Sequence, residues 1–205
     1  MKAKFGLTLF VNMIQNYLTY LDFINKKLQK FFEAQSPYIF CQKGCAKCCQ
    51  DGEYPFSQIE FAYIMSGFTA LPQETRYKIL NNIAEIKLAK KNFTGDKFLY
   101  RCPFLIDNEC AVYAHRGIIC RSFGLIYTVE GEEKPKIPFC AYKGLNYSNV
   151  FDTETGIMTT EKYKALNIPQ EPLAYNVSYD FLTGEHFEKM YNFKFGDKKP
   201  LIDWF

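Results

Sequence analysis

The stretch CQKGCAKCCQDGEYPF, residues 41–56, places four cysteines within nine consecutive positions: Cys41, Cys45, Cys48 and Cys49. Closely spaced thiols can converge on one ion at little entropic cost, because the chain that connects them is short. Cysteine binds metal as the thiolate, and soft sulfur ligands suit zinc, iron–sulfur clusters and copper(I). Side chains of neighbouring residues usually diverge. We therefore expect Cys48 and Cys49 to point to different places, one to the metal and the other to a second centre or the core.

The composition favours one sizeable globular domain in a reducing compartment. The chain has 205 residues, of which 48% are hydrophobic and 18% aromatic, so a packed core is expected. A net charge of +3 predicts no nucleic-acid partner. The first 20 residues faintly resemble a signal peptide, but Asn12, Gln15 and Asn16 interrupt the apolar run, no cleavage site follows, and no membrane span is predicted. We therefore predict a cytoplasmic protein, in which eight cysteines indicate metal binding over disulfides.

The remaining chain predicts an α+β fold, more helical than extended, around an irregular cysteine-rich metal-binding centre. Apolar residues at helical spacing predict an amphipathic helix within residues 1–35. Residues 36–145 form the predicted metal-binding domain. In it, a capping-box pair at Ser57 and Glu60 starts a helix that we expect to end at Gly67. We expect a turn at residues 106–110 and a strand at residues 122–129. Residues 146–205 read as an aromatic-rich extension packed on the same domain.

A second group of cysteines completes a family resemblance. The segments CQKGCAKCC, residues 41–49, and CPFLIDNECAVYAHRGIICR, residues 102–121, resemble the YkgJ-like CxxCxxCC cysteine-cluster family, a zinc- or iron-chelating domain. The resemblance spans residues 41 to about 140 and implies metal chelation. It makes all eight cysteines candidate ligands: Cys41, Cys45, Cys48, Cys49, Cys102, Cys110, Cys120 and Cys140. Family members usually carry Arg-Pro where this chain has Arg116-Gly117, and we expect this departure to leave the turn more flexible.

Four thiolates complete either a structural zinc site or a [4Fe–4S] cluster, so eight can serve two centres or one centre with spare thiols. Buried thiolate sites carry negative charge that must be offset. Arg116, Arg121, Lys43 and Lys47 are the candidates for that role. His115 is an alternative ligand, although a single histidine in such a place is more often a hydrogen-bonding neighbour.

Three functional classes remain open from the sequence. The first is an iron–sulfur or zinc protein without identified catalysis, and the second is a zinc-stapled module that binds an unknown protein partner. The third is a metal-dependent enzyme. The spacing of Cys41, Cys45 and Cys48 equals that of radical S-adenosylmethionine enzymes, and the cysteine pattern also looks like a segment of flagellin lysine methylases. The sequence shows neither alternating strand–helix units nor a glycine-rich nucleoside loop, so neither enzyme context is predicted.

Overall fold

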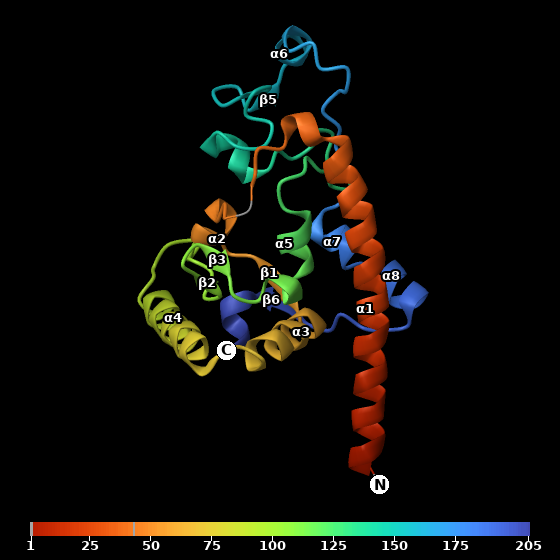
Figure 1. Ribbon diagram of the computed structural model, residues 1–205, viewed down its shortest axis with the longest axis vertical. Coiled ribbons are helices and arrows are strands. Elements are labelled where there is room, and N and C mark those ends of the chain that lie inside the picture. Colours follow the sequence, from red (N-terminus) through yellow and green to blue (C-terminus); the bar gives the residue numbers. More distant parts are fainter. Residues whose placement is uncertain (1, 43) are drawn as a thin grey trace.

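The computed structural model describes residues 2–42 and 44–205 of the chain. One long helix runs along the side of a body built from short helices, short strands and irregular segments (Figure 1). The helices are α1 Lys2–Ala34, α2 Lys47–Gln50, α3 Gln58–Thr69, α4 Gln73–Lys91, α5 Ile118–Ser122, α6 Thr160–Ala165, α7 Tyr179–Leu182 and α8 Glu185–Tyr191. The 3-10 turns are η1 Ser36–Tyr38, η2 Tyr113–His115, η3 Phe139–Lys143 and η4 Leu201–Trp204.

The described strands are short and pair two by two. Antiparallel pairs join β1 Pro55–Ser57 to β6 Lys198–Pro200, β2 Leu105–Ile106 to β3 Glu109–Cys110, and β4 Phe151–Asp152 to β5 Ile157–Met158. Most of the regular structure is therefore helical, and the predicted α+β class is confirmed. The strand expected at residues 122–129 is wrong. Tyr127 forms only isolated bridges to Lys136 and Tyr175, so no neighbouring chain runs alongside that segment for more than one residue.

One hydrophobic cluster holds the long helix against the body, and a second packs the body itself. Tyr17, Tyr20 and Ile24 of α1 are buried against the aromatic residues that follow α7. The Tyr20 ring, for example, lies with its centroid 4.9 Å from that of Phe187. The second cluster joins α3 and α4 to the segment 98–112 and to the last residues of the chain. Helix formation in α1 follows from its buried stripe, because packing of an amphipathic face supplies most helix stability in proteins.

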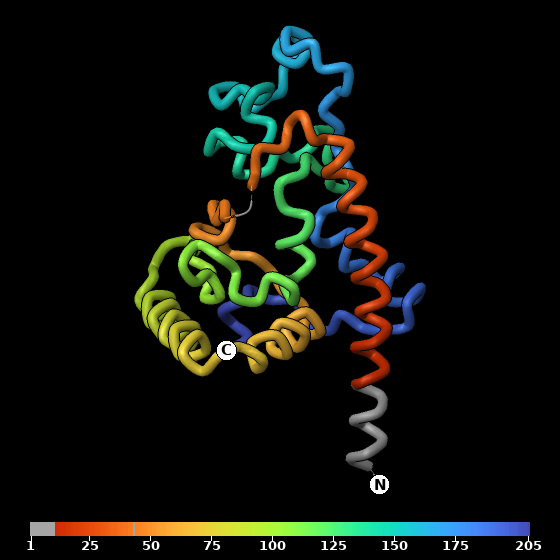
Figure 2. Tube along the Cα trace, viewed as in Figure 1, coloured from red at the N-terminus to blue at the C-terminus, as the bar shows by residue number. Residues whose placement is uncertain are grey.

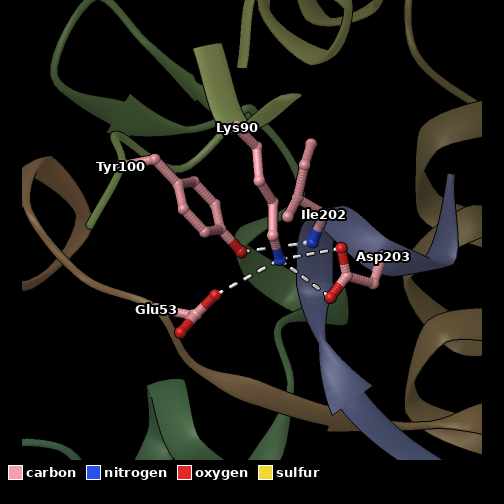
Figure 3. A network of polar contacts seen from close by, with 5 residues as sticks. All are labelled: Glu53, Lys90, Tyr100, Ile202 and Asp203. Atoms are coloured by element: carbon pink, nitrogen blue, oxygen red, sulfur yellow. Dashed lines mark hydrogen bonds and ion pairs between the residues drawn. The ribbon is translucent and has the colours of Figure 1, made fainter. Parts of the chain in front are cut away.

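The end of the chain docks onto the segment that follows the first cysteines. β6 pairs with β1, and the Trp204 ring stacks on Phe61 with centroids 5.3 Å apart. Lys90 of α4 donates to Asp203 at 2.9 Å and to Glu53 at 3.4 Å, which ties α4, the C-terminal turn and the cysteine segment together (Figure 3). Residues 198–204 therefore support the chain that leads out of the cysteine cluster.

The colours of the tube in Figure 2 show that segments far apart in the sequence meet in the middle of the body. β1, at the end of the orange segment that follows α1, packs against the green α5, and the blue C-terminal segment β6–η4 lies below them in this view (Figure 2). None of the described helices is long and apolar enough to cross a membrane.

Candidate metal centre

A cavity of about 930 Å³ lies where these segments meet, and all eight cysteines line it. Cys41, Cys45, Cys48 and Cys49 come from the loop before α2 and from α2 itself. The others come from the segment before β2, from β3, from α5 and from η3: Cys102, Cys110, Cys120 and Cys140. Two stretches separated by more than 50 residues thus converge on one space. All eight are free thiols.

Backbone hydrogen bonds hold the first thiols against the second group. The Cys102 N–H donates to the Cys49 carbonyl at 2.7 Å, and the Gly52 N–H donates to the Tyr100 carbonyl at 3.2 Å. Residues 49–52 therefore run antiparallel to residues 100–102. This pairing fixes the distance between the two cysteine stretches through the main chain, which is stiffer than side chains alone.

A tight hairpin places Cys110 beside Cys102. Leu105 pairs with Cys110 across β2 and β3. The connecting residues Asp107 and Asn108 both have positive φ, 50° and 62°, which two-residue hairpin loops require and which Asp and Asn tolerate well. The turn predicted from the sequence at residues 106–110 is confirmed.

Cys120 is carried by α5, whose start is fixed by a buried carboxylate. Glu60 of α3 is fully buried, and its Oε1 accepts the Ile118 N–H at 2.7 Å. Its Oε2 accepts the Ser57 N–H at 2.9 Å and the Tyr179 hydroxyl at 2.7 Å. The capping-box pair predicted at Ser57 and Glu60 is present. The same carboxylate also caps α5, a role that sequence reasoning missed.

Gly117, which precedes α5, is required by space. Its φ is −67°, an ordinary value, but a Cβ at this position would lie 2.4 Å from the Phe56 ring. Gly67 is similar. It lies inside α3, which continues to Thr69, and a Cβ there would lie 2.6 Å from the His115 ring. The helix end expected at Gly67 is therefore wrong, and close packing explains this glycine.

Asn146, which follows the last cysteine in the sequence, joins two of the segments that surround the cavity. It is fully buried, and its Oδ1 accepts the N–H groups of Phe40 and Cys41, both at 2.9 Å. Its Nδ2 donates to the Gly124 carbonyl at 2.9 Å. One side chain thus fixes the entry to the cysteine loop against the exit from α5. No signal in the sequence identifies this residue, because its role depends on three distant backbone groups.

Replacing Asn146 with alanine is expected to lower the free energy of unfolding by about 2–3 kcal/mol. Two partly buried N–H groups and one buried carbonyl would lose their partner. An unsatisfied buried group costs about 1–3 kcal/mol, and the cost is smaller for the N–H groups because water can reach them. Asn81→Ala, on the exposed face of α4, is the matched control and is expected to change stability by less than about 0.5 kcal/mol. Urea denaturation of both variants measures the difference. Equal stability of the two variants would contradict the role assigned to Asn146.

Arg121 serves the framework around the thiols. Its guanidinium donates to the carbonyls of Arg116 at 2.9 Å and Ala114 at 2.8 Å, and to Asn25 Oδ1 at 3.0 Å. These bonds tie α5 to α1 and to η2. Arg121 lines the cavity, as do Arg116 and Lys47. Lys43 lies outside the described residues. The Arg121 guanidinium is already held by three hydrogen bonds. Arg116 and Lys47 are therefore the basic residues that are freer to offset the negative charge of the thiolates.

The two histidines lie elsewhere. The His115 ring packs on Tyr63 with centroids 4.8 Å apart and faces Gly67, and it does not line the thiol cavity. The His186 ring packs on Phe187 at 4.1 Å. Within residues 2–42 and 44–205, no three His, Cys, Asp or Glu side chains already converge closely enough to hold an ion. The eight thiols line one cavity but do not yet converge closely enough to coordinate an ion. Coordination therefore requires rotation of the cysteine side chains within the cavity.

The environment of the cavity favours protonated thiols when no cation is present. Burial raises the pKa of Cys102 to about 12 and that of Cys140 to about 11. Burial also raises the pKa of Cys41 to about 12, with a further contribution from the Cys45 thiol. The Cys48 Sγ lies 3.8 Å from the Cys49 Sγ, and this contact is the largest cause of the raised pKa of Cys48. A cation among these sulfurs would reverse the balance, because opposite charge favours the thiolate.

The metal-free protein is expected to lose stability as the pH rises above about 8.5. An unfolded chain releases thiol protons near pH 8.5, whereas the folded state holds the Cys140 proton up to about 11. The unfolded state is therefore favoured as the pH rises between those values. For one buried thiol this amounts to about 2 kcal/mol between pH 8 and 10. Denaturation of reduced, chelator-treated protein at these two pH values measures the effect, and equal or greater stability at pH 10 would contradict it.

Comparison with known proteins agrees with this geometry. A cavity lined by cysteine thiols is typical of domains that bind soft metals. Residues 40–141 match the family model CxxCxxCC, described as "Putative zinc- or iron-chelating domain". Through this segment, about half of its length, the chain belongs to that family. Three residues separate Cys41 from Cys45, one more than the family's name indicates. No curated protein and no solved structure matches the chain.

Proposed function

We propose that this protein binds iron as a [4Fe–4S] cluster, or alternatively zinc, through thiolates of the eight cysteines that line the cavity. The convergence of all eight thiols on one cavity carries the proposal. Both centres accept four thiolates, and the donor set around the cavity is rich in the soft sulfur that they prefer. The spacing of Cys41, Cys45 and Cys48 supports the iron–sulfur assignment.

The residues around the cavity have separable roles in this proposal. The thiols would hold the metal, which when bound supplies positive charge and, for a cluster, one-electron chemistry. Asn146, Glu60 and the chain pairing at residues 49–52 and 100–102 hold the cysteine-bearing segments around the cavity. Leu28 and Phe32 of α1 line the same cavity and form an apolar part of its wall. α1 lies outside residues 40–141, so the family model does not describe this part of the wall.

Purification without oxygen distinguishes the two metals. A [4Fe–4S] protein is expected to be brown, with visible absorption that bleaches on reduction and equal amounts of iron and acid-labile sulfide. A colourless protein that contains zinc would support the alternative of a zinc-stapled interaction module. Protein that contains neither iron nor zinc in stoichiometric amount under these conditions would overturn the proposal.

The cytoplasm is the compartment in which this function is expected. Metal ligation requires thiolates, and reducing compartments keep thiols free of disulfides. The compartment remains a prediction from the cysteine content.

A further inference from the structure

The cavity provides more sulfur and more space than one metal centre uses. One zinc ion or one [4Fe–4S] cluster takes four thiolates, whereas eight line this cavity. Its volume of about 930 Å³ also exceeds the space that one ion and its ligands require. The remaining four thiols are not simply core residues, because Cys140 alone among the eight exposes less than a tenth of its surface.

One group of thiols is held by the frame around Asn146. The Leu145 N–H donates to the Cys140 carbonyl at 3.0 Å, and the next residue, Asn146, accepts the Cys41 N–H. The turn that carries Cys45 begins immediately after, with the Cys45 N–H donating to the Gln42 carbonyl at 2.9 Å. Cys41, Cys45 and Cys140 therefore belong to one hydrogen-bonded unit.

A second group is held by a different frame. The Cys49 carbonyl accepts the Cys102 N–H, and the β2–β3 hairpin carries Cys110 back beside that segment. On α5, Ile119, the neighbour of Cys120, packs against the same hydrophobic cluster as Cys102 and Cys110, which brings α5 to the hairpin side.

Cys48 and Cys49 lie at the boundary between the two groups. Their sulfurs are 3.8 Å apart, a separation that allows each to enter a different coordination sphere. α2, which carries Cys48, packs against η3, which carries Cys140, and this contact brings Cys48 within reach of the first group. The Cys49 carbonyl is bonded to the Cys102 N–H, which anchors Cys49 to the second group.

We propose that the protein holds two separate metal centres, each with four thiolates. The loop set is Cys41, Cys45, Cys48 and Cys140, and the hairpin set is Cys49, Cys102, Cys110 and Cys120. This inference rests on the proposed function and specifies its stoichiometry and ligand partition. Basic residues are available on the cavity wall for both sites. Arg116 and Lys47 both line the cavity, and Lys47 begins the helix that carries Cys48 and Cys49.

Counting metal per chain tests the proposal without any substitution. Protein purified without oxygen is expected to contain about two zinc ions, or about eight irons and eight sulfides, because each four-thiolate site takes one ion or one cluster. A parallel titration of reduced, metal-free protein with zinc, followed by native mass spectrometry, is expected to reach two ions per chain. One zinc ion, or four irons, at saturation would overturn the two-centre proposal while leaving the proposed function intact. No bound metal in either experiment would overturn both.

Two double variants test the partition. Cys41→Ser with Cys140→Ser removes two ligands of the loop set, and Cys102→Ser with Cys110→Ser removes two of the hairpin set. Each is expected to retain half of the wild-type metal, and each serves as the control for the other, because the retained centre shows that the variant is folded. Retention of the full metal content by either variant would contradict the assignment. If either double variant binds no metal, the metal content of the wild-type protein decides between one centre and two.

Discussion

Removing the metal from the loaded protein is expected to lower its melting temperature by about 10 °C. A ligand present at 1,000 times its dissociation constant stabilises a protein by about 4 kcal/mol. For a chain of this size, each kcal/mol corresponds to about 2–4 °C. Calorimetry of protein purified without oxygen, before and after dialysis against a chelator and a thiol reductant, measures the change.

The structure also predicts where the loss of order occurs. Five separate segments present thiols to the cavity, and the loops among them contain little regular structure. The cluster of α1 with α8 is built from apolar contacts that include none of the cysteines, whereas Cys102 and Cys110 pack against the cluster of α3 with α4. Hydrogen exchange is therefore expected to accelerate at residues 41–52 and 100–120 more than in α1. Restoration of the melting temperature when the metal is returned is the control. An unchanged melting temperature after proven metal loss would contradict the coupling.

Replacing Glu60 with alanine is expected to cost about 3–5 kcal/mol of unfolding free energy. Its carboxylate accepts bonds from the main chain of α3 and α5 and from the Tyr179 hydroxyl, all of them buried. Truncation would leave these donors without partners, and each costs about 1–3 kcal/mol. Chemical denaturation of the metal-free protein measures this cost independently of metal binding.

Two further variants separate the causes. Glu60→Gln preserves the shape and one acceptor oxygen, so its effect is expected to be smaller than that of alanine. Glu85→Ala removes an exposed glutamate from α4 and is expected to change stability by less than about 0.5 kcal/mol. The role of Glu60 would be refuted by a Glu60→Ala variant as stable as Glu85→Ala.

The local features of the fold were predictable where short-range patterns determine them. The amphipathic stripe predicted α1, and the pair Ser57 and Glu60 predicted the start of α3. The strand expected at residues 122–129 failed for a tertiary reason. Alternating apolar residues describe a half-buried extended segment, but a strand also needs a neighbour, and only Tyr127 has one. The predicted extended pieces around residues 106–110 succeeded because the turn itself supplies the neighbour.

The same distinction applies to the metal centre. The cysteines identified the candidate ligands, since four thiols within nine residues of a reduced protein indicate metal binding. The residues that position them were not visible in the sequence. Asn146 and the second role of Glu60 depend on backbone groups that are distant along the chain and become neighbours only in the fold. Among the basic residues, Arg121 is tied to backbone carbonyls, a role that its position beside Cys120 does not reveal.

The central claim is that sulfur from both cysteine stretches binds metal in the shared cavity. X-ray absorption spectroscopy at the metal edge of protein purified without oxygen tests it most directly. The account predicts a first shell made of sulfur alone at about 2.3 Å, as in four-thiolate zinc or iron–sulfur sites. A first shell dominated by nitrogen or oxygen, or a spectrum unchanged when the cysteines of either stretch are replaced by serine, would contradict it.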